Sequence, residues 1–386
     1  MENTPVEKIQ QIAEAQRQYF RSGVTLDLKF RRQALKMLAD ALDKWEKPLA
    51  KALWSDLHKS YEEAYLTELS IVKGEVRNHL KNLERWAKPR RVGTPIKMMP
   101  SRSRVISEPL GTTLIISPWN YPVQLLLNPL VGALSAGCTA VLKPSPYVPE
   151  VSRVLQQMIE DTFAPEYVAV VQGNREVNTA LLDCRWDLIF FTGSPALGRT
   201  VMAAAARNLT PVVLELGGKS PCIVDADADI KVAAKRIAWG KSLNAGQTCI
   251  APDYLLVHSS VKDAFVKELQ RQFRKLLGKN PQNATHFVRM VNDRAWERVT
   301  GYLTEGKILF GGASSRADRY IEPTVIETTP DSRVMQEEIF GPVFPLLTFE
   351  STDEAIRFVT DREKPLALYY FGCDCKAQKV LRHTSS

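Results

Sequence analysis

Apolar residues recur at helical spacing through the first part of the chain, and charged residues lie between them. One such series consists of Leu35, Leu38, Leu42 and Leu49. A second long amphipathic pattern runs from Glu63 to Trp86. Spacings of three and four residues place apolar side chains on one face of a helix. Residues 5–88 are therefore predicted to be helical, with Pro89 ending the last helix.

From Arg104 onward the pattern changes to short β-rich runs that alternate with helical windows. The predicted strands are Thr112–Ile116, Thr139–Leu142, Tyr167–Val171, Leu188–Phe191, Val212–Leu216, Cys222–Val224 and Tyr254–Val257. The predicted helices are Leu125–Ala136, Val151–Thr162, Val177–Leu182, Ala196–Asn208 and Lys231–Leu243. This alternation indicates βαβ units and a mostly parallel sheet. Ligands bind beyond the carboxyl ends of such strands, so we expect the chemically important motifs there.

Length and composition are those of a two-domain globular protein. The chain has 386 residues, which exceeds one ordinary hydrophobic core. Its apolar fraction of 45% and charged fraction of 24% argue against disorder. The net charge of +8 suits anionic ligands such as nucleotides. A denser basic cluster between Lys88 and Arg104 is interleaved with Pro and Gly, which favours a solvated or interface segment, and no nucleic-acid partner is expected.

The cysteines and the first residues indicate a cytoplasmic protein with free thiols. The start, MENTPVEKIQ, lacks the basic and apolar segments of a signal peptide, and no apolar stretch reaches about 18 residues. Disulfides are therefore not expected among the six cysteines. None of the five histidines pairs with cysteines at zinc spacing, and Cys373-x-Cys375 is too short for a zinc knuckle. We expect no metal site and interpret this cysteine pair as structurally neutral.

Two predicted strands end in residues that could hold a phosphate or a ribose. In FTGSPALG, Gly193 permits a tight turn, Ser194 can cap the following helix, and Pro195 suits its first turn. The start of a helix binds anions through its free N–H groups. Taken alone, this is also an ordinary capped turn. In LKPS, Lys143 could reach a ribose hydroxyl or a phosphate, although a single lysine is more often exposed to solvent.

Three other motifs contain candidate catalytic groups. Glu215 ends an apolar strand in VLELGGK, where partial desolvation would raise its pKa and suit it to general-base catalysis; alone, it could equally be a salt-bridged glutamate. Cys249 follows the small and polar residues of NAGQT, so backbone amides could activate its thiol and hold an oxyanion. The apolar neighbours of Cys138, Cys184 and Cys222 indicate small core residues instead. Asn120 lies between two prolines in SPWNYP, as a fixed donor or a simple turn residue.

The ordered set of motifs is more specific than any member. It consists of PWNYP, LKPS, FTGS, LELGGK, NAGQTC and EEIFGP. Together these resemble the aldehyde dehydrogenase superfamily, over nearly the whole chain. Glu215 and Cys249 lie 34 positions apart, as in the family pattern. The segments LTPVVLELGGKSP, APDY and KPLALY are most similar to the class 3 branch.

The resemblance implies a role for each matching residue. Cys249 matches the nucleophile that forms a thiohemiacetal and then a thioester, Asn120 matches the oxyanion donor, and Glu215 matches the base that activates water. The implied cofactor is NAD or NADP. Its implied contacts are Trp119, Lys143 at the adenosine ribose, Gly193 and Ser194 beside the pyrophosphate, and Glu338 and Phe340 at the nicotinamide ribose and ring.

Two features depart from the family pattern. Many members have a glutamate that binds the adenosine ribose where this chain has Pro146. Loss of that carboxylate would remove its repulsion of a 2′-phosphate, so we expect NADP to be accepted beside NAD. The chain also ends at Ser386 without the family's glycine-rich segment, PFGG-type loop and last strand. We therefore expect a catalytic domain that is truncated at its carboxyl end, with an unpaired sheet edge, and whether a membrane tail follows is left open.

The resemblance predicts an α/β fold with a Rossmann-type NAD(P)-binding domain over residues 1–211 and an α/β catalytic domain over 212–386. Residues 87–108 are expected to form an oligomerisation hairpin, and the chain to form a homodimer. The expected reaction is oxidation of a medium-chain aliphatic or aromatic aldehyde to its carboxylate. Two alternatives are a coenzyme A-acylating relative, which the presence of Glu215 disfavours, and a truncated, non-catalytic nucleotide-binding paralogue.

Overall fold

The computed structural model describes residues 2–386, which form two compact units. The first unit comprises residues up to Leu53 together with Ala64–Glu215, and the second comprises Trp54–Glu63 and Leu216–Ser386. The sequence-based boundary between residues 211 and 212 falls four residues earlier than this division. The shift arises because the strand after Pro211 belongs to the first sheet. A ten-residue piece of the helical region also lies in the second unit.

The helical prediction for residues 5–88 is confirmed, and the region is divided by short turns. Its helices are α1 (Val6–Arg21), α2 (Leu28–Lys44), α3 (Glu46–Leu57), α4 (Tyr61–Ala64) and α5 (Ser70–Ala87). A π-helical turn at Tyr65–Leu69 connects α4 to α5. The last helix ends two residues before Pro89, in keeping with the restricted backbone of a residue that precedes proline.

The first unit contains a five-stranded sheet in the order β5-β4-β3-β6-β7. Its strands are β3 (Thr112–Ile116), β4 (Thr139–Lys143), β5 (Val168–Val170), β6 (Leu188–Gly193) and β7 (Val212–Leu216). Strand β3 is parallel to both β4 and β6, with Ile116 opposite Lys143 on one side and Phe191 on the other. All five strands occur where the hydrophobic pattern predicts them. The chain leaves β3 toward β4 and later returns to its other side, which is the strand order of a Rossmann-type sheet.

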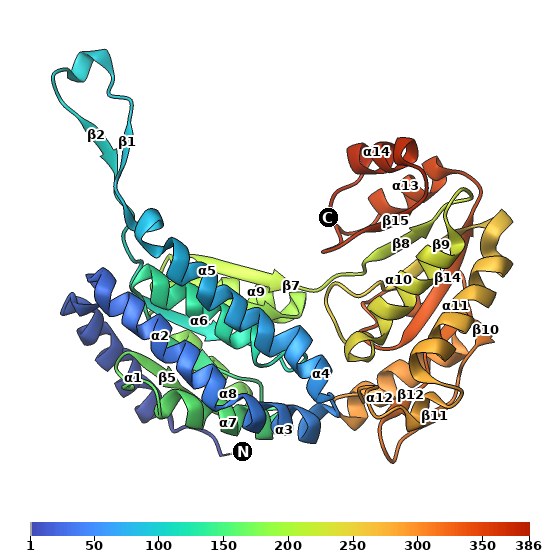
Figure 1. Cartoon of the computed structure of the whole chain (residues 1–386), viewed down its shortest axis with the longest axis horizontal. Helices are drawn as coiled ribbons and strands as arrows, with labels where there is room; N and C mark the ends of the chain where they lie inside the picture. Colours follow the sequence, from blue (N-terminus) through green and yellow to red (C-terminus); the bar gives the residue numbers. More distant parts are fainter. Residues whose placement is uncertain (1) are drawn as a thin grey trace. The chain divides into compact units, whose positions relative to one another are not determined.

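Two groups of helices pack on this sheet (Figure 1). The crossover helices are α6 (Gln124–Ala136), α7 (Pro149–Glu160), α8 (Arg175–Asp183) and α9 (Pro195–Ala206), each within two residues of its predicted start or end. Helix α6 contacts β3 and β4 and is itself covered by α2 and α5. Helices α1, α8 and α9 form the other group, with α1 contacting β3 and β4. The strands β3 and β4 are consequently buried along their whole length.

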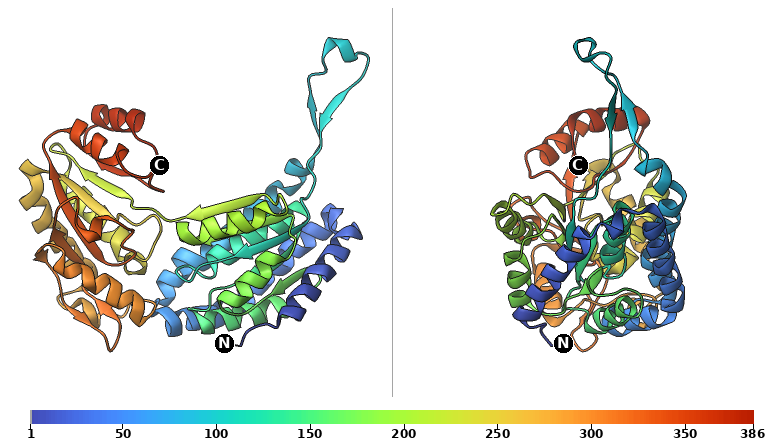
Figure 2. Two further views of the ribbon diagram at one scale, coloured as in Figure 1. Left: turned by 180° about the vertical axis from the view of Figure 1, so that it is seen from behind. Right: turned by 90° about the vertical axis from the view of Figure 1, so that its left-hand side faces the viewer.

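Residues 87–108 contain a two-stranded antiparallel hairpin, β1 (Arg90–Val92) and β2 (Ser103–Val105). Figures 1 and 2 show it as an arm that extends beyond the helices of its unit. Its strands have little cover, since every residue of β1 is exposed. At its tip Ile96 is 90% exposed and Met99 63% exposed. An isolated hairpin of this kind buries too little apolar surface to be stable without a partner.

The second unit contains a six-stranded sheet in the order β10-β13-β14-β9-β8-β15. Its strands are β8 (Pro221–Val224), β9 (Tyr254–His258), β10 (Lys307–Phe310), β13 (Thr324–Glu327), β14 (Val343–Phe349) and β15 (Tyr369–Phe371). Five of these strands are parallel, and β10 is antiparallel to β13. A separate short ribbon pairs β11 (Ser314–Ser315) with β12 (Tyr320–Ile321).

The helices of the second unit cover this sheet. They are α10 (Ile230–Ser242), α11 (Lys262–Leu277), α12 (Asp293–Thr300), α13 (Thr352–Thr360) and α14 (Asp374–His383). Helices α13 and α14 contact β14 and β15, and α10 packs on α11. The apolar core includes Ile223, Leu256 and Val343 from three adjacent strands. The two sheets confirm the predicted α/β class. No helix among residues 2–386 combines the length and apolarity needed to cross a membrane.

The structure corrects one expectation about the motifs. The motifs that contain Asn120, Lys143 and Ser194 follow strands β3, β4 and β6, so they lie at the carboxyl edge of the first sheet as predicted. Cys249 instead precedes β9, and Glu338 precedes β14, at the amino edge of the second sheet. A segment that leads from a helix into a strand of a parallel sheet must lie at the amino edge, and both residues occupy such segments.

Candidate active site

In the first unit, three predicted cofactor contacts lie at the same edge of the sheet, because β4 and β6 flank β3 and are parallel to it. Lys143 is the last residue of β4 and pairs in register with the last residue of β3. Gly193 ends β6, and a Cβ atom on it would come within 2.6 Å of the Phe191 ring. Ser194 follows as the N-cap of α9 and accepts a hydrogen bond from the Leu197 N–H at 3.4 Å. The exposed start of this helix offers N–H groups to an anion.

Lys143 is buried, contrary to the exposed position that is usual for lysine. Only 1% of its surface is accessible, and burial lowers the pKa of its ammonium group to about 8. Its one hydrogen bond within residues 2–386 goes to the Pro144 carbonyl at 2.8 Å. An ammonium group has three donors, so this buried charge retains unused hydrogen-bonding capacity. Such a group is destabilising unless a ligand supplies further acceptors.

Other buried polar atoms at the same edge also lack partners. The Ser117 hydroxyl, directly after β3, and the Thr192 hydroxyl, near the end of β6, have no hydrogen-bond partner within residues 2–386. Buried hydroxyl groups are normally paired, but the Thr113 and Thr139 hydroxyls at the opposite edge are unpaired within that range as well. It is therefore the buried Lys143 ammonium group beside the Ser117 and Thr192 hydroxyls that distinguishes the carboxyl edge. With Lys143 these two hydroxyls form a surface that fits the hydroxyl groups and phosphates of a dinucleotide.

Asn120 is buried in the loop that joins β3 to α6. The loop is fixed at its far end by Glu68, whose carboxylate accepts hydrogen bonds from the Val123 N–H at 2.7 Å and the Gln124 N–H at 3.3 Å. Glu68 is fully buried and lies in the π-helical turn before α5. Trp119 precedes Asn120 and is half-buried. The π-helical turn that contains Glu68, although remote in sequence, thus determines the conformation of the loop that contains the predicted oxyanion donor, Asn120.

In the second unit, Cys249 lies in the loop between α10 and β9 and is half-buried. The approach to it contains three consecutive residues with positive φ: Asn244 at 49°, Ala245 at 51° and Gly246 at 73°. A Cβ atom on Gly246 would come within 2.5 Å of the Gly341 carbonyl oxygen. Glycine is therefore required there, and it brings the loop of Cys249 against the EEIFGP segment.

Gln247 fixes this loop from inside. Its side-chain amide donates to the carbonyls of Asn244 and Arg289, both at 3.0 Å, and its oxygen accepts from the Val291 N–H at 3.1 Å. The Asn244 backbone N–H in turn donates to the Glu63 carboxylate at 2.6 Å. All these groups belong to the second unit, which explains why the segment around Glu63 is part of it. The thiol is consequently presented by a rigid backbone.

Glu338 occupies a confined position beside the glycines of LELGGK. A Cβ atom on Gly217 would lie 2.2 Å from its Oε2, so only glycine permits this placement. Burial raises the pKa of the Glu338 carboxyl to about 8, and nearby Asp253 acts in the same direction, while the Gly218 N–H, Lys219 and Lys241 oppose the shift. Phe340 follows with a φ of 50°, a strained value for a residue with a large side chain.

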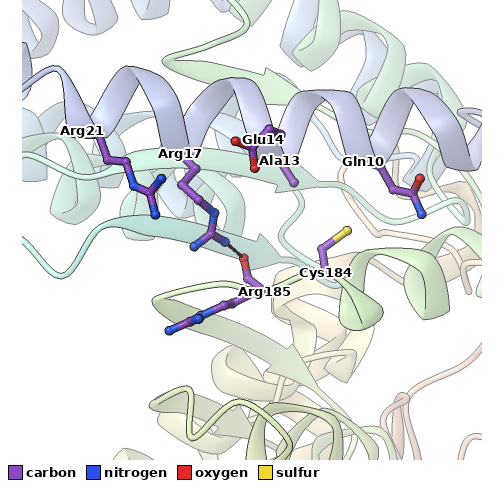
Figure 3. A pocket seen from close by; sticks show the side chains of 7 residues that line it. All are labelled: Gln10, Ala13, Glu14, Arg17, Arg21, Cys184 and Arg185. Carbon is purple, nitrogen blue, oxygen red and sulfur yellow. Dashed lines mark hydrogen bonds between the residues drawn. The ribbon is translucent and has the colours of Figure 1, made fainter.

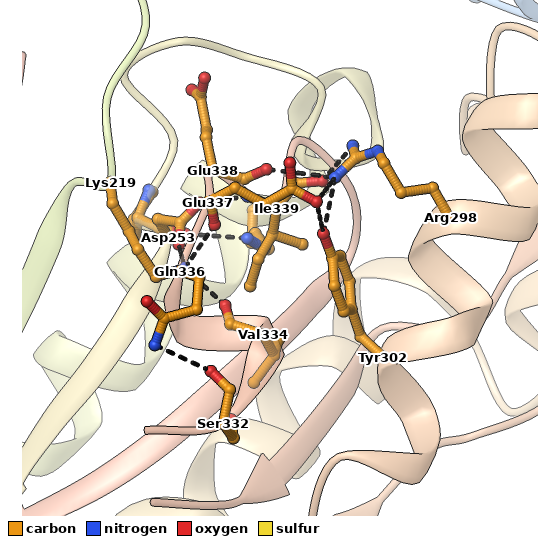
Figure 4. A network of polar contacts seen from close by, with 12 residues as sticks. Lys219, Asp253, Arg298, Tyr302, Ser332, Val334, Gln336, Glu337, Glu338 and Ile339 are labelled. Carbon is orange, nitrogen blue, oxygen red and sulfur yellow. Dashed lines mark hydrogen bonds and ion pairs between the residues drawn. The ribbon is translucent and has the colours of Figure 1, made fainter. Parts of the chain in front are cut away.

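A buried ion pair holds the segment that contains Glu338 (Figure 4). Lys219 donates to Asp253 Oδ1 at 2.5 Å and to the carbonyls of Val334 and Glu337 at 2.8 and 2.9 Å. The other Asp253 oxygen accepts from the Ile339 N–H at 2.8 Å. The segment is therefore fixed at three backbone positions by two side chains from other loops.

Arg298 and Tyr302 hold the outer side of the same segment. Arg298 donates to the Glu338 and Ile339 carbonyls at 3.2 and 2.7 Å, and the Tyr302 hydroxyl donates to the Glu337 carboxylate.

Sequence reasoning missed Lys219, Asp253, Gln247 and Arg298 as positioning residues. Lys219 and Gln247 stand inside the recognised motifs and could have been noticed there, whereas nothing in the sequence connects Arg298 with residues 40 positions away.

Glu215 differs from its prediction. It lies in β7, the edge strand of the first sheet, and is exposed. The expected partial desolvation of its carboxylate is therefore wrong for the described chain, because β7 has a neighbouring strand on one side only and Glu215 belongs to its exposed face. Lys241, in contrast, is fully buried near the Cys249 loop, and burial lowers the pKa of its ammonium group to about 8. Its Nζ donates to the Pro252 carbonyl at 2.9 Å.

The first unit also has a pocket of about 450 Å³ between α1 and the segment before β6 (Figure 3). It is lined by Gln10, Ala13, Glu14, Arg17, Arg21, Cys184 and Arg185. Arg17 donates to the Arg185 carbonyl at 2.5 Å across it. Because Cys184 and Arg185 precede β6, this pocket lies at the amino edge of the sheet, away from Lys143 and Ser194, and no predicted site residue lines it.

Comparison with known proteins agrees with this architecture. Residues 1–385 match the model of the aldehyde dehydrogenase family. The chain is 46% identical over 371 residues to a 4,4'-diaponeurosporen-aldehyde dehydrogenase of Staphylococcus aureus, covering 95% of this chain and 81% of the relative. It is 41% identical to a dimeric NADP-preferring aldehyde dehydrogenase of Canis lupus familiaris, covering 98% of this chain and 84% of the relative.

A solved structure supports the same assignment. The substrate-bound state of Staphylococcus aureus AldH superposes with a TM-score of 0.96 at 44% identity, covering 98% of this chain and 83% of that one. Relatives named as family 3 members, such as the rat A2 form at 43% identity, confirm the resemblance to the class 3 branch. The chain therefore belongs to the aldehyde dehydrogenase family, whose enzymes oxidise aldehydes to carboxylic acids with NAD or NADP.

Proposed function

We propose that Cys249 is the nucleophile of an NAD(P)-dependent aldehyde oxidation. Its thiolate attacks the aldehyde carbon to give a thiohemiacetal, and the Asn120 amide and the Cys249 backbone N–H donate hydrogen bonds to the resulting oxyanion. Bound NAD or NADP supplies the acceptor of the hydride that leaves this carbon. Cys249 then carries a thioester. Glu215 takes a proton from the water that attacks the thioester, which releases the carboxylate and restores the thiolate.

The observation that supports this proposal best is the fixed backbone around Cys249. Gln247 forms three hydrogen bonds at 3.0–3.1 Å within the loop and to its neighbours, so the sulfur does not have to be ordered when the substrate binds. A cysteine that served only as a small core residue would need no such loop, and its side chain would be fully buried like that of Cys222.

The test is NAD(P)H formation, followed by absorbance, with hexanal and benzaldehyde as substrates. The Cys249→Ala variant should lose at least about a thousandfold in kcat/KM, because no covalent intermediate can form. Cys222→Ala is the matched control and should retain activity. Equal activity of Cys249→Ala and the unaltered protein would refute the proposal. Thioester formation with transfer to coenzyme A but not to water would favour an acylating enzyme.

We also propose that the substrate is a medium-chain aliphatic or aromatic aldehyde. The proposal rests on the resemblance to the class 3 branch, whose members favour such aldehydes; the S. aureus relative is named for 4,4'-diaponeurosporen-aldehyde. A kcat/KM for hexanal and benzaldehyde well above that for the polar glyceraldehyde is expected, and the reverse order would contradict the proposal.

We infer that the first unit holds the adenosine and pyrophosphate parts of the cofactor. Lys143 would bind the adenosine ribose, Gly193 and Ser194 would lie beside the pyrophosphate, and Trp119 would line the same edge. Glu338 and Phe340 of the second unit would contact the nicotinamide ribose and ring. Pro146 replaces a carboxylate that would repel a 2′-phosphate, so NADP should serve beside NAD. A kcat/KM for NADP more than about a thousandfold below that for NAD would exclude this interpretation.

We propose that the hairpin of β1 and β2 docks onto a second copy of the chain to form a homodimer. The exposed apolar residues Ile96 and Met99 at its tip support a protein partner. A relative that is named as dimeric, at 41% identity, supports a second copy as that partner. Sedimentation velocity should give a dimer for the unaltered chain and a monomer for Ile96→Asp. A dimer that persists in this variant would contradict the proposed contact.

A cytoplasmic location is proposed as well. All six cysteines are free thiols within residues 2–386, which suits a reducing compartment. Cell fractionation should recover the protein with soluble cytoplasmic markers, and recovery with membranes would contradict this location.

A further inference from the structure

Two cysteines that the proposed reaction does not use lie against each other in the second unit. Cys373 and Cys375 stand at the start of α14, directly after β15 (Figure 1). Their sulfur atoms are 2.8 Å apart, close enough for a thiol of one to donate to the other. Cys375 is exposed and Cys373 half-buried. The short spacing that argued against a zinc site in the sequence therefore brings two accessible thiols into direct contact.

The groups around the pair give the two sulfurs different characters. The Cys373 thiol is hydrogen-bonded to Cys375 and to the Asp227 carboxylate, and these contacts raise the pKa of Cys373, while the Lys376 backbone N–H opposes the shift. The ionised form of Cys373 is thus disfavoured. Cys375 is the more exposed of the two residues, so an incoming small disulfide reaches its sulfur first.

The surroundings favour a bond between the sulfurs over a metal site. Within residues 2–386, no group of three or more His, Cys, Asp or Glu side chains could hold a metal ion. The nearest cation, Lys376, already pairs with Asp225 at 3.1 Å and Asp227 at 3.3 Å. A disulfide bond measures about 2.05 Å, so closing the pair requires the sulfurs to approach by less than about 1 Å.

The pair is also remote from the proposed nucleophile along the strands. Cys373 follows β15, so it lies at the carboxyl edge of the second sheet, whereas Cys249 precedes β9 at the amino edge. Strands β15, β8 and β9 are parallel and adjacent, which separates the two positions by the length of the strands. A disulfide within the pair therefore does not involve Cys249.

We propose that Cys373 and Cys375 form a redox-active thiol pair that closes into an intrachain disulfide by exchange with a low-molecular-weight disulfide. The Cys375 thiolate attacks one sulfur of the small disulfide, forms a mixed disulfide and expels one small thiolate. Cys373 then attacks the Cys375 sulfur, the intrachain bond forms, and the second small thiolate leaves. The two protons of the cysteines pass to the two released thiolates. The protein loses two electrons and the small disulfide gains them.

Mass spectrometry of the whole chain tests this directly with oxidised glutathione as the probe. Trypsin cuts after Arg362 and Lys376 but not between Lys364 and Pro365, so one peptide, residues 363–376, contains both cysteines and no other. After exposure to the probe and alkylation, this peptide should carry no alkyl group. Its mass should be about 2 Da below that of the reduced peptide without alkyl groups. Dithiothreitol should restore two alkylation sites.

Two single variants test the order of attack, and Cys184 serves as the internal control. Cys373→Ser should leave Cys375 as a stable glutathione adduct, while Cys375→Ser should slow adduct formation at Cys373 at least about tenfold. Cys184 has no second cysteine two residues away and should show at most a glutathione adduct. Aldehyde oxidation should persist in both variants. The proposal would be overturned if Cys373 and Cys375 were both still alkylated at concentrations of oxidised glutathione that modify Cys184. A disulfide between this peptide and another peptide would also overturn it.

Discussion

The two sheet edges that carry the predicted site residues differ in how their polar groups are satisfied. At the carboxyl edge of the first sheet, buried Lys143 has a single hydrogen bond, and the Ser117 and Thr192 hydroxyls have none within residues 2–386. At the amino edge of the second sheet, Lys219 and Gln247 each take part in at least three hydrogen bonds within their own or neighbouring loops. The lysine of the first edge has unused donors, whereas the lysine and the glutamine of the second edge are bonded to its own residues, although the Ser220 hydroxyl there is also unpaired within residues 2–386.

This difference fits two separate tasks. Unpaired buried polar groups are costly, so an edge that keeps them is arranged for a ligand that will complete their bonds. A saturated network orders the backbone in advance, which a nucleophile requires. The first edge is thus suited to binding and the second to positioning. Mutations should separate the two: changes at the second edge should reduce stability, and changes at the first should reduce cofactor affinity.

The largest effect on stability is expected for Lys219→Met. It removes three hydrogen bonds and leaves Asp253, whose side chain is 3% exposed, as an unpaired buried charge. Loss of one partner from such a pair costs about 3–5 kcal/mol. The free energy of unfolding from urea titration measures it. Lys379→Met is the matched control, because its pair with Asp353 is 43% and 57% exposed and should contribute far less to stability. Similar losses in both variants would show that the network does not stabilise the second unit.

A smaller effect, of opposite sign, is expected for Lys143→Met. The pKa of Lys143 is lowered to about 8 in the folded protein from 10.5, so below pH 8 folding buries a charge that methionine lacks. The variant should be more stable than the unaltered protein at pH 7, by up to about 3 kcal/mol. Between pH 8 and 10.5 the unfolded state binds more protons at this site, so the stability of the unaltered protein rises and the difference should shrink.

The same variant should bind the cofactor more weakly. Loss of the ammonium group removes the donors available to a ribose or phosphate, and we expect the Kd for NADPH to rise about tenfold or more. Fluorescence titration of NADPH measures it, with Lys379→Met as a control of unchanged affinity. A Lys143→Met protein that is destabilised and binds NADPH normally would mean that the lysine is a structural residue and that the first edge is not the binding edge.

Much of this could be predicted from the hydrophobic pattern and the motifs. The strands from Thr112 to Val257 occur as predicted, because a buried parallel strand is an uninterrupted β-branched run. The prediction of the sheet edge for Cys249 was wrong. The order of elements along the chain would have been enough to place it at the amino edge, since NAGQTC leads into a strand. The networks of Glu68 and Arg298 could not be predicted, because they join residues 40 to 56 positions apart through tertiary contacts.

Glu215 shows a different limit of sequence reasoning. A carboxylate at the end of an apolar strand suggested burial, but burial depends on whether neighbouring strands and helices cover that strand. Strand β7 is the last in its sheet, and its residues alternate between half-buried and exposed. The position of a strand within its sheet follows from the packing of the whole unit. The hydrophobic pattern of the five residues of β7 does not reveal the position of that strand within the sheet.

The smallest effect is expected from a comparison of two helix N-caps, one taken from each unit. The Ser194 hydroxyl accepts one long hydrogen bond of 3.4 Å, whereas the Asp229 carboxylate at the start of α10 accepts two, at 3.0 and 3.1 Å. Ser194→Ala should therefore cost about 0.5 kcal/mol in unfolding free energy and Asp229→Ala about 1 kcal/mol. Cofactor affinity should follow the opposite order. Only Ser194 adjoins the unpaired groups of the first edge, so only its loss should raise the Kd for NADPH, by about two- to fivefold. If Asp229→Ala weakened NADPH binding as much, a cap would act on the cofactor through helix stability alone, and the effect of Ser194→Ala would no longer mark the first edge as the binding edge.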